Sequence, residues 1–316
     1  MIRSLYNIIR NFFKPQYFYL TFGILSLIYF QRRQKKKKQI LWKGFRNLGN
    51  TCYINAALQL LRQIDIINPN FLEQQQSQLA KQLKQLFKMI NESQQVEEQL
   101  QKLHSISQQH QIHELRGGDS YQILFTFLRT INNDINKERI ALGQQNVLNN
   151  FERHISIVSL DGYQCQQCHQ FLQKEKNQIE IIEEKDFSID IHNFNDLNKL
   201  QSIQQESEML NFCQNCSSQT KFKTSRVIQN FTQFIVVKFS EQNLQYLSES
   251  EGKKEIFLQG SAQPYKIIGY CSYTGSHYTY TANYNDVWIQ FNDSRVQIEQ
   301  KLFQRIYYLL LMRVFK

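Results

Sequence analysis

The six cysteines of this 316-residue chain fall into two groups with different chemistry. Four of them form two C-x-x-C pairs, Cys165 with Cys168 and Cys213 with Cys216. Two such thiolate pairs are the ligand pattern of a structural zinc site, and the alternative is a redox dithiol. Because both pairs fall in one β-rich region, the metal site is the preferred interpretation. The other two, Cys52 and Cys271, stand alone, and Cys271 lies in an apolar segment and is expected in the core.

Cys52 stands where the Asn50-Thr51 turn gives way to an apolar segment. Apolar residues recur there at three- and four-residue steps, which predicts a buried helix: Ile54, Ala57, Leu58 and Leu61. A thiol at a helix N-terminus lies near unpaired backbone N–H groups, which favour the reactive thiolate. Asn47, five residues earlier, could present its side-chain amide to a developing oxyanion. The alternative is a structural cysteine, the usual role of an isolated one.

A cysteine nucleophile needs a base, and the base needs a third group that fixes its tautomer. Six histidines lie in polar or helical surroundings, where a solvated side chain is the default: His104, His110, His113, His154, His169 and His192. His277 lies instead in SYTGSHYTYTANYNDVWIQFNDSRV, which predicts hairpin strands separated by turns at Thr274-Gly275 and Asn285-Asp286. We expect His277 and Asn292 to meet across this ladder. The alternative is an aromatic hairpin with a structural histidine.

Both segments resemble the sequence boxes of the ubiquitin-specific proteases (USPs), a family of papain-like cysteine deubiquitinases. GFRNLGNTCYINAALQ is similar to the cysteine box G-L-x-N-x-G-N-T-C-Y-x-N-x-x-L-Q. The later segment is similar to the histidine box, G-x-H-Y followed by W-x-x-F-[DN]-D-x-x-V. The resemblance implies that Cys52 is the nucleophile and His277 the general base. It also implies that Asn292 orients the base, Asn47 supports the oxyanion, and Asp293 is the adjacent supporting acid.

The resemblance extends, with departures, to residues that would hold the C-terminal tail of ubiquitin: Asp119, Gln122 and Tyr278. The family box Q-D-A-x-E-[FL] is matched by GDSYQIL, in which neutral Gln122 replaces the acidic residue. A charge-assisted hydrogen bond is stronger than a neutral one, so weaker recognition of the tail arginines is expected, with the chemistry intact. Ser276 also replaces the glycine that usually precedes the histidine.

The fold class expected from the pattern is α+β, since helical periodicity precedes residue 150 and short β-type runs follow it. One such helical stretch runs from 71 to 104 and another from 121 to 131. The resemblance implies a USP hand over residues 41–316. It has a helical thumb at about 41–150, zinc-ribbon fingers at about 151–240 and a β palm at about 241–316. The four paired cysteines would bind the structural zinc, and no organic cofactor is expected.

The net charge of +10 is concentrated in residues 1–40, which hold nine basic and no acidic residues. The remaining residues carry 28 basic against 27 acidic side chains, so a nucleic-acid partner is not expected. The apolar stretch Tyr17–Phe30 is short for a bilayer crossing, and QRRQKKKK follows it. Such a cluster holds its side of a membrane anchor in the cytosol. The alternative is a core helix followed by a solvated basic run.

These observations predict a membrane-anchored thiol deubiquitinase with a cytosolic catalytic domain. It would cleave the bond after the C-terminal glycine of ubiquitin, on ubiquitinated proteins at or near the membrane. A short anchor with basic flanks favours the mitochondrial outer membrane. The alternatives are a membrane-anchored ubiquitin-binding pseudoenzyme without hydrolase activity and a zinc-ribbon nucleic-acid protein, the latter disfavoured by the near-neutral body.

Overall fold

The structure is a computed structural model that divides into two compact units, residues 1–42 and 43–316. It describes residues 42–73, 77–109, 118–142, 149–155, 157–169, 183–186, 188–191, 202–203, 208–239, 245–246, 252–258, 261–299 and 305–315. The predicted anchor and basic flank at 1–40 lie outside these residues. Among the described helices, none combines the length and apolar character that a bilayer crossing requires.

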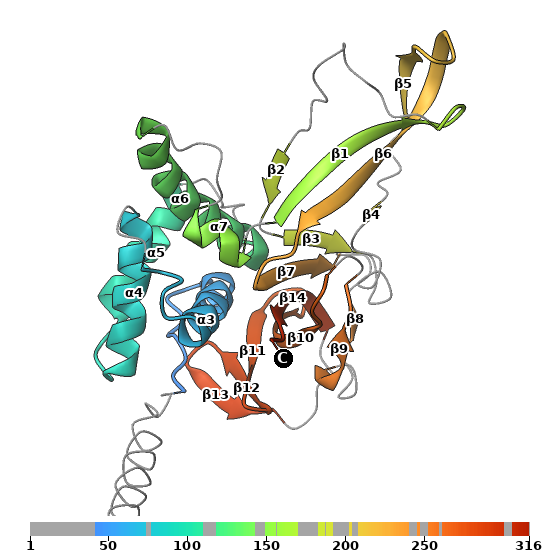
Figure 1. Ribbon diagram of the computed structural model, residues 1–316. Helices are drawn as coiled ribbons and strands as arrows, with labels where there is room; N and C mark the ends of the chain where they lie inside the picture. The colour runs from blue at the N-terminus through green and yellow to red at the C-terminus, as the bar shows by residue number, and fades with distance from the viewer. Residues whose placement is uncertain are drawn as a thin grey trace, which may run out of the picture. The chain divides into compact units, whose positions relative to one another are not determined.

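Five helices of the described residues precede the strands (Figure 1). They are α3 (Cys52–Ile67), α4 (Gln78–Asn91), α5 (Glu97–Gln109), α6 (Ser120–Ala141) and α7 (Asn150–Ile155). Helix α3 is buried along its length from Cys52 to Ile64 and packs against α6 on one side and β11 on another. The helical stretch predicted from 71 to 104 is present as two helices, α4 and the first part of α5. The chain breaks between α4 and α5, where Ser93 adopts a positive φ of 58°.

The strands form two sheets, and their helix-first, strand-later order confirms the α+β class. The bounds are β1 Ile157–Cys165, β2 Glu183–Asp186, β3 Ser188–Ile191, β4 Ser202–Ile203, β5 Glu208–Cys213, β6 Ser218–Asn230, β7 Phe234–Phe239, β8 Gln245–Tyr246, β9 Glu255–Ile256, β10 Tyr265–Tyr273, β11 Tyr278–Tyr284, β12 Val287–Asn292, β13 Arg295–Ile298 and β14 Arg305–Arg313. The larger sheet has the order β13-β12-β11-β10-β14-β7-β3, with β8 on β14 and β9 on β10. The smaller has the order β2-β1-β6-β4, with β5 on β6.

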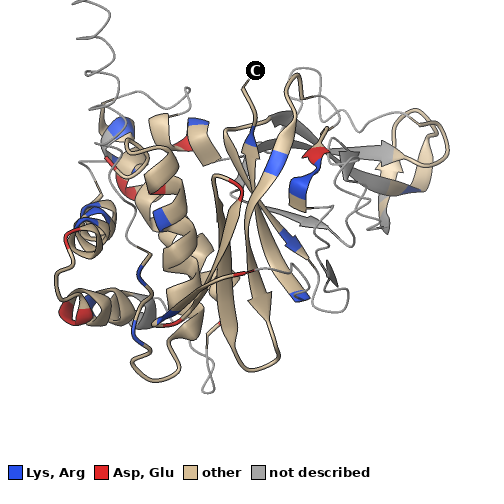
Figure 2. Cartoon of the chain, turned by 90° about the horizontal axis from the view of Figure 1, so that it is seen from below, with Lys and Arg blue, Asp and Glu red and all other residues tan. Residues whose placement is uncertain are grey.

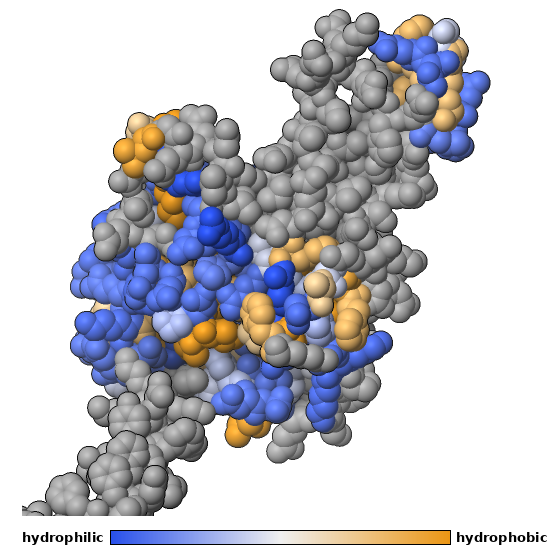
Figure 3. Space-filling model, in the orientation of Figure 1, coloured by the Kyte–Doolittle hydropathy of each residue, from blue (hydrophilic) through white to orange (hydrophobic). Residues whose placement is uncertain are grey.

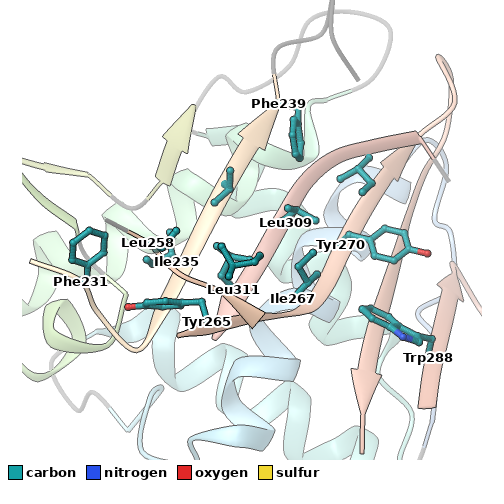
Figure 4. Packing of buried hydrophobic residues seen from close by; sticks show 13 residues of the cluster. Phe231, Ile235, Phe239, Leu258, Tyr265, Ile267, Tyr270, Trp288, Leu309 and Leu311 are labelled. Atoms are coloured by element: carbon teal, nitrogen blue, oxygen red, sulfur yellow. The ribbon is translucent and has the colours of Figure 1, made fainter. Parts of the chain in front are cut away.

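Four strands of the larger sheet, β7, β10, β11 and β14, are buried on both faces. One face carries a cluster of apolar side chains that includes Ile235, Tyr265, Trp288, Leu309 and Leu311 (Figure 4). Because side chains alternate along a strand, the intervening residues of β14 point the other way, toward the helices. There the hydroxyl of Tyr308 hydrogen-bonds that of Ser120 at 2.9 Å. Acidic and basic residues of the described chain are interspersed over these elements (Figure 2).

The turns flanking β11 have the residues that their backbone requires. Asn285 and Asp286 join β11 to β12 with φ values of 53° and 66°. A two-residue hairpin loop with both φ positive matches the right-handed twist of its strands and favours Asn and Asp. In the loop between β10 and β11, Gly275 takes a φ of 95°. Both predicted turns are confirmed, and the second presents His277 at the tip of the β10–β11 hairpin.

Candidate active site

Cys52 is the first residue of α3, and the preceding loop is organised around Asn47. The amide oxygen of Asn47 accepts hydrogen bonds from the backbone N–H groups of Gly49 at 3.0 Å and Thr51 at 3.2 Å. Gly49 and Asn50 both adopt positive φ, which makes the sharp turn into the helix. Asn47 therefore fixes the backbone that presents the thiol.

The Cys52 thiol is largely buried, with 8% of the residue exposed. Burial is the main influence on its pKa and raises it above the ordinary thiol value, and the negative charge of Asp293 adds to the rise. Backbone N–H hydrogen bonds, including one from Tyr278, lower the pKa in part. The sequence-based expectation of a favoured thiolate is thus reversed, because desolvation outweighs the helix N-terminus. The resting thiol is neutral and needs a base.

His277 and Asn292 meet as the hairpin register predicted. His277 immediately precedes β11 and Asn292 ends β12, and the two strands pair in antiparallel register. The Nε2 atom of His277 lies 2.8 Å from Oδ1 of Asn292. An amide oxygen only accepts, so Nε2 carries the proton and Nδ1 is the basic nitrogen of the neutral ring. The ring shares no hydrogen bond with the Cys52 thiol, and a catalytic contact of this kind commonly tightens only in the complex with substrate.

Asp293 joins the histidine segment to the cysteine loop. Its Oδ2 accepts a hydrogen bond from the side chain of Asn47 at 2.9 Å and lies 4.0 Å from Nε2 of His277. Its Oδ1 accepts from the side chain of Asn55 at 2.7 Å. A Cβ on Gly44 would lie 1.9 Å from the backbone oxygen of Asp293, so only glycine permits this approach. Asn55 matched the cysteine box, but sequence reasoning gave it no role.

The predicted tail-binding residues lie around one aromatic cluster. Oδ1 of Asp119 accepts backbone N–H bonds from Tyr121 at 2.7 Å and Gln122 at 3.2 Å, so it caps the start of α6. The other carboxylate oxygen accepts the hydroxyl of Tyr307, whose ring centre lies 5.8 Å from that of Tyr278. Gln122 itself is exposed in the first turn of α6. The three predicted residues are thus brought together, with Asp119 engaged in structural bonds.

The four paired cysteines form one cluster at the outer end of the smaller sheet. All four sulfurs lie within 4.8 Å of one another, with Cys165 Sγ 3.8 Å from Cys216 Sγ and Cys168 Sγ 3.6 Å from Cys213 Sγ. Zinc–sulfur bonds of about 2.3 Å in a tetrahedron place sulfurs about 3.8 Å apart. The donor set and spacing therefore fit a zinc ion.

The backbone around the cluster has the same form at both pairs. Cys165 ends β1 and Cys213 ends β5, and each begins a short turn. The residue after the second cysteine of each pair takes a left-handed conformation, with φ of 58° at His169 and 48° at Ser217. The two matching turns each direct two thiols toward one point, as binding of a single metal ion would require.

Comparison with known proteins agrees with this geometry. The family model "Ubiquitin carboxyl-terminal hydrolase" matches residues 43–311. A search of curated proteins finds no match. Among solved structures, the Ubp8/Sgf11/Sus1/Sgf73 SAGA DUB module bound to monoubiquitin superposes with a TM-score of 0.61 at 14% identity, covering 93% of this chain and 75% of that one. The same module bound to ubiquitin aldehyde gives 0.58 at 15% identity, again covering 93% and 75%.

The Pan2 catalytic unit of Neurospora crassa, with protease and nuclease domains, gives a TM-score of 0.60 at 13% identity, covering 86% of this chain and 57% of that one. At these identities the structural matches show the fold, whereas the family model extends over nearly all of the described elements. It spans both the cysteine loop and the hairpin that carries His277. The chain belongs to the ubiquitin carboxyl-terminal hydrolase family, of the ubiquitin-specific protease type, and is a cysteine deubiquitinase.

Proposed function

We propose that Cys52, His277 and Asn292 hydrolyse the peptide or isopeptide bond after the C-terminal glycine of ubiquitin. The proposal rests on the tip of the β10–β11 hairpin, where two adjacent residues contact Asn292 and Cys52. His277 at this tip is hydrogen-bonded to Asn292, and the backbone N–H of the next residue, Tyr278, hydrogen-bonds the Cys52 thiol. Two of the superposed structures contain bound ubiquitin or ubiquitin aldehyde, which supports ubiquitin as the partner.

The reaction follows from the protonation states of these groups. Nδ1 of His277 removes the Sγ proton of Cys52, and the thiolate attacks the glycine carbonyl carbon. The side-chain amide of Asn47 and the N–H groups at the start of α3 donate to the resulting oxyanion. The protonated His277 gives its proton to the departing amine, which leaves a thioester. A water molecule, deprotonated by the same imidazole, then releases the ubiquitin carboxylate and restores the thiol.

We further propose that Cys165, Cys168, Cys213 and Cys216 hold a structural zinc that shapes the fingers. The support is the sulfur geometry, because the four thiols converge within 4.8 Å of one another, as the ligands of one tetrahedral ion do. The described surface at this end of the molecule carries both hydrophobic and hydrophilic residues (Figure 3). Beside the cluster on β5, Leu210 and Phe212 are 70% and 53% exposed. An apolar fingertip of this kind suits contact with the body of ubiquitin.

The direct test is hydrolysis of ubiquitin-rhodamine by residues 43–316, with Cys52→Ala as the control. The proposal expects turnover by the parent protein and none by the variant. A ubiquitin-binding pseudoenzyme would instead bind ubiquitin equally well in both forms and release no fluorophore from either. Turnover that survives in Cys52→Ala would exclude the assigned nucleophile.

The pKa of Cys52 predicts how the substrate-free enzyme reacts with a small electrophile. Because burial and Asp293 raise this pKa, alkylation by iodoacetamide should increase with pH through a midpoint above the usual thiol value of about 8.5. Below that midpoint the thiol stays protonated and reacts slowly. The measurement is the alkylation rate at Cys52, followed by mass spectrometry from pH 6 to 10. A plateau already reached below pH 7 would show a resting thiolate.

We also propose, from the sequence alone, that residues 1–40 anchor the enzyme in a membrane, with the catalytic domain in the cytosol. Full-length protein should resist carbonate extraction, whereas deletion of residues 1–38 should release an active, soluble enzyme. The outer mitochondrial membrane is the proposed site. Replacing the basic residues Arg32, Arg33 and Lys35–Lys38 with glutamine should then divert the protein to other membranes. Full-length protein that fractionates with the cytosol would show a core helix instead.

A further inference from the structure

Gln63 is a fully buried glutamine near the far end of α3, eleven residues after Cys52, and it joins this helix to the hairpin that carries His277. Its side-chain nitrogen donates to the backbone oxygen of Ile268 at 2.6 Å and to that of Asn283 at 3.1 Å. Its side-chain oxygen accepts the hydroxyl of Tyr280 at 2.5 Å. Both amide hydrogens and the amide oxygen are thus used, and every partner belongs to β10 or β11.

The two carbonyls lie where the β10–β11 ladder ends. The paired register between these strands begins at Gly269 and Ala282, so Ile268 and Asn283 are the next residues beyond it. Ile268 is also the extra residue of a bulge, because β10 pairs with β14 through Ile267 and then Gly269. The Gln63 amide therefore bridges the two strands just beyond the last paired residues of the ladder.

Gly269 provides the space that this arrangement needs. A Cβ at this position would lie 2.1 Å from the hydroxyl oxygen of Tyr280 and 2.6 Å from the side-chain oxygen of Gln63. Since Gly269 has a negative or extended φ, the glycine is not required by the backbone conformation. It is required by the close approach of the two side chains.

The helix and the strand have matching lengths between two points of attachment. From Cys52 to Gln63 the helix rises about 16 Å, and from Tyr278 to Asn283 the strand extends about 17 Å. At one end the N–H of Tyr278 reaches the Cys52 thiol, and at the other the Gln63 amide reaches Asn283. Helix α3 packs along β11 between these points (Figure 1). A shift of the strand along the helix would break both attachments together.

We propose that Gln63 is a positioning residue for the deubiquitinase reaction. By holding α3 in one register against the β10–β11 hairpin, it sets where His277 and the N–H of Tyr278 lie relative to Cys52. The inference rests on the proposed function, because it concerns the same nucleophile and base. Gln63 lies more than one helical turn beyond the cysteine box and does not contact the reacting atoms.

The test is Gln63→Leu, which keeps the volume but removes all three hydrogen bonds. Because small misplacements of reacting groups slow catalysis strongly, kcat for ubiquitin-rhodamine should fall at least about 10-fold with KM within about 2-fold. Gln99→Leu is the matched control. Gln99 is another buried glutamine, and its amide donates to a backbone oxygen, that of Gln82 in α4 at 3.3 Å, away from the hairpin. It should lower thermal stability and leave kcat unchanged.

A second readout separates positioning from general loosening and does not depend on ubiquitin cleavage. Burial raises the pKa of the Cys52 thiol, and the N–H of Tyr278 lowers it in part. If the hairpin shifts while the thiol stays buried, this N–H is lost and alkylation of Cys52 by iodoacetamide at pH 8 should slow. A loosened fold would expose the thiol and speed alkylation. Slower alkylation together with lower kcat supports the proposal. Faster alkylation, or an unchanged kcat, overturns it.

Two further variants keep the test decisive. If Gln63→Leu does not fold, Tyr280→Phe can replace it, because this variant removes only the hydroxyl that orients the Gln63 amide. It should lower kcat and slow alkylation of Cys52, each by less than Gln63→Leu. The double variant Gln63→Leu/Tyr280→Phe removes both partners of the hydrogen bond between these side chains and can regain thermal stability. If Gln63 has only a structural role, kcat should then recover with stability. If Gln63 positions the hairpin, kcat should stay low. If the parent protein does not cleave ubiquitin, the proposed function fails, and alkylation still decides the role of Gln63.

Discussion

His277→Ala is expected to lower kcat for ubiquitin-rhodamine by about 10²–10⁴-fold, the usual contribution of a positioned general base. The effect should be this large because the Cys52 thiol is buried and its pKa is raised, so little thiolate forms without a proton acceptor. KM should change little, since the ring hydrogen-bonds Asn292 and acts as the base rather than as a contact for ubiquitin. Steady-state kinetics at pH 7.5 measures both constants.

Asn292→Ala should have a smaller effect on kcat than His277→Ala. It leaves the imidazole in place but removes the acceptor at 2.8 Å that fixes the proton on Nε2. The loss in kcat should therefore be clearly smaller than for His277→Ala. His154→Ala is the control, because His154 hydrogen-bonds Gln233 and lies outside the proposed site. A His277→Ala enzyme that retains parental kcat would show that another group accepts the thiol proton.

Loss of one zinc ligand should disorder the fingertip and weaken ubiquitin binding while sparing the nucleophile. Structural zinc sites contribute on the order of 10 kcal/mol to the folding of small modules, so Cys213→Ser should melt the turns around the cluster. We expect one zinc ion per parent chain by metal analysis, a loss of zinc in the variant, and a rise in KM of at least about 10-fold. Alkylation of Cys52 should remain at the parental rate.

The control for this prediction is Cys271→Ala, which removes a buried thiol of β10 rather than a member of the cluster. It should retain the full zinc content. A parent protein that contains no zinc yet has full activity would contradict the metal assignment. An increase in KM with zinc still bound would instead place the effect of Cys213 in direct contact with ubiquitin.

The features that the sequence predicted are those encoded within short segments. The clustering of four cysteines follows from two C-x-x-C spacings. The hairpin turns follow from Gly, Asn and Asp residues that tolerate positive φ. The His277–Asn292 contact follows from strand register. The break between α4 and α5 was missed because both helices keep the same apolar periodicity, and Ser93 gives no strong stop signal.

The features that the sequence could not supply depend on distant packing. The raised pKa of Cys52 comes mainly from burial, with the distant Asp293 adding to it, and local residues reveal neither. The bonds of Gln63 reach residues 205 and 220 positions later in the chain. In sequence, Gln63 is one of many glutamines, and only the placement of the β10 bulge against α3 distinguishes it. Asn55 likewise gains its role from Asp293, 238 positions away.

Covalent trapping by ubiquitin that carries an electrophile in place of its C-terminal carboxylate tests the central claim most directly. Full-length protein would be incubated with this probe, digested, and the modified peptide identified by mass spectrometry. Cys52 is the residue that the proposed mechanism places at the glycine carbonyl, so the adduct should form on Cys52 and be absent from Cys52→Ala. An adduct on any other cysteine, or no adduct on a folded parent protein, would contradict the account.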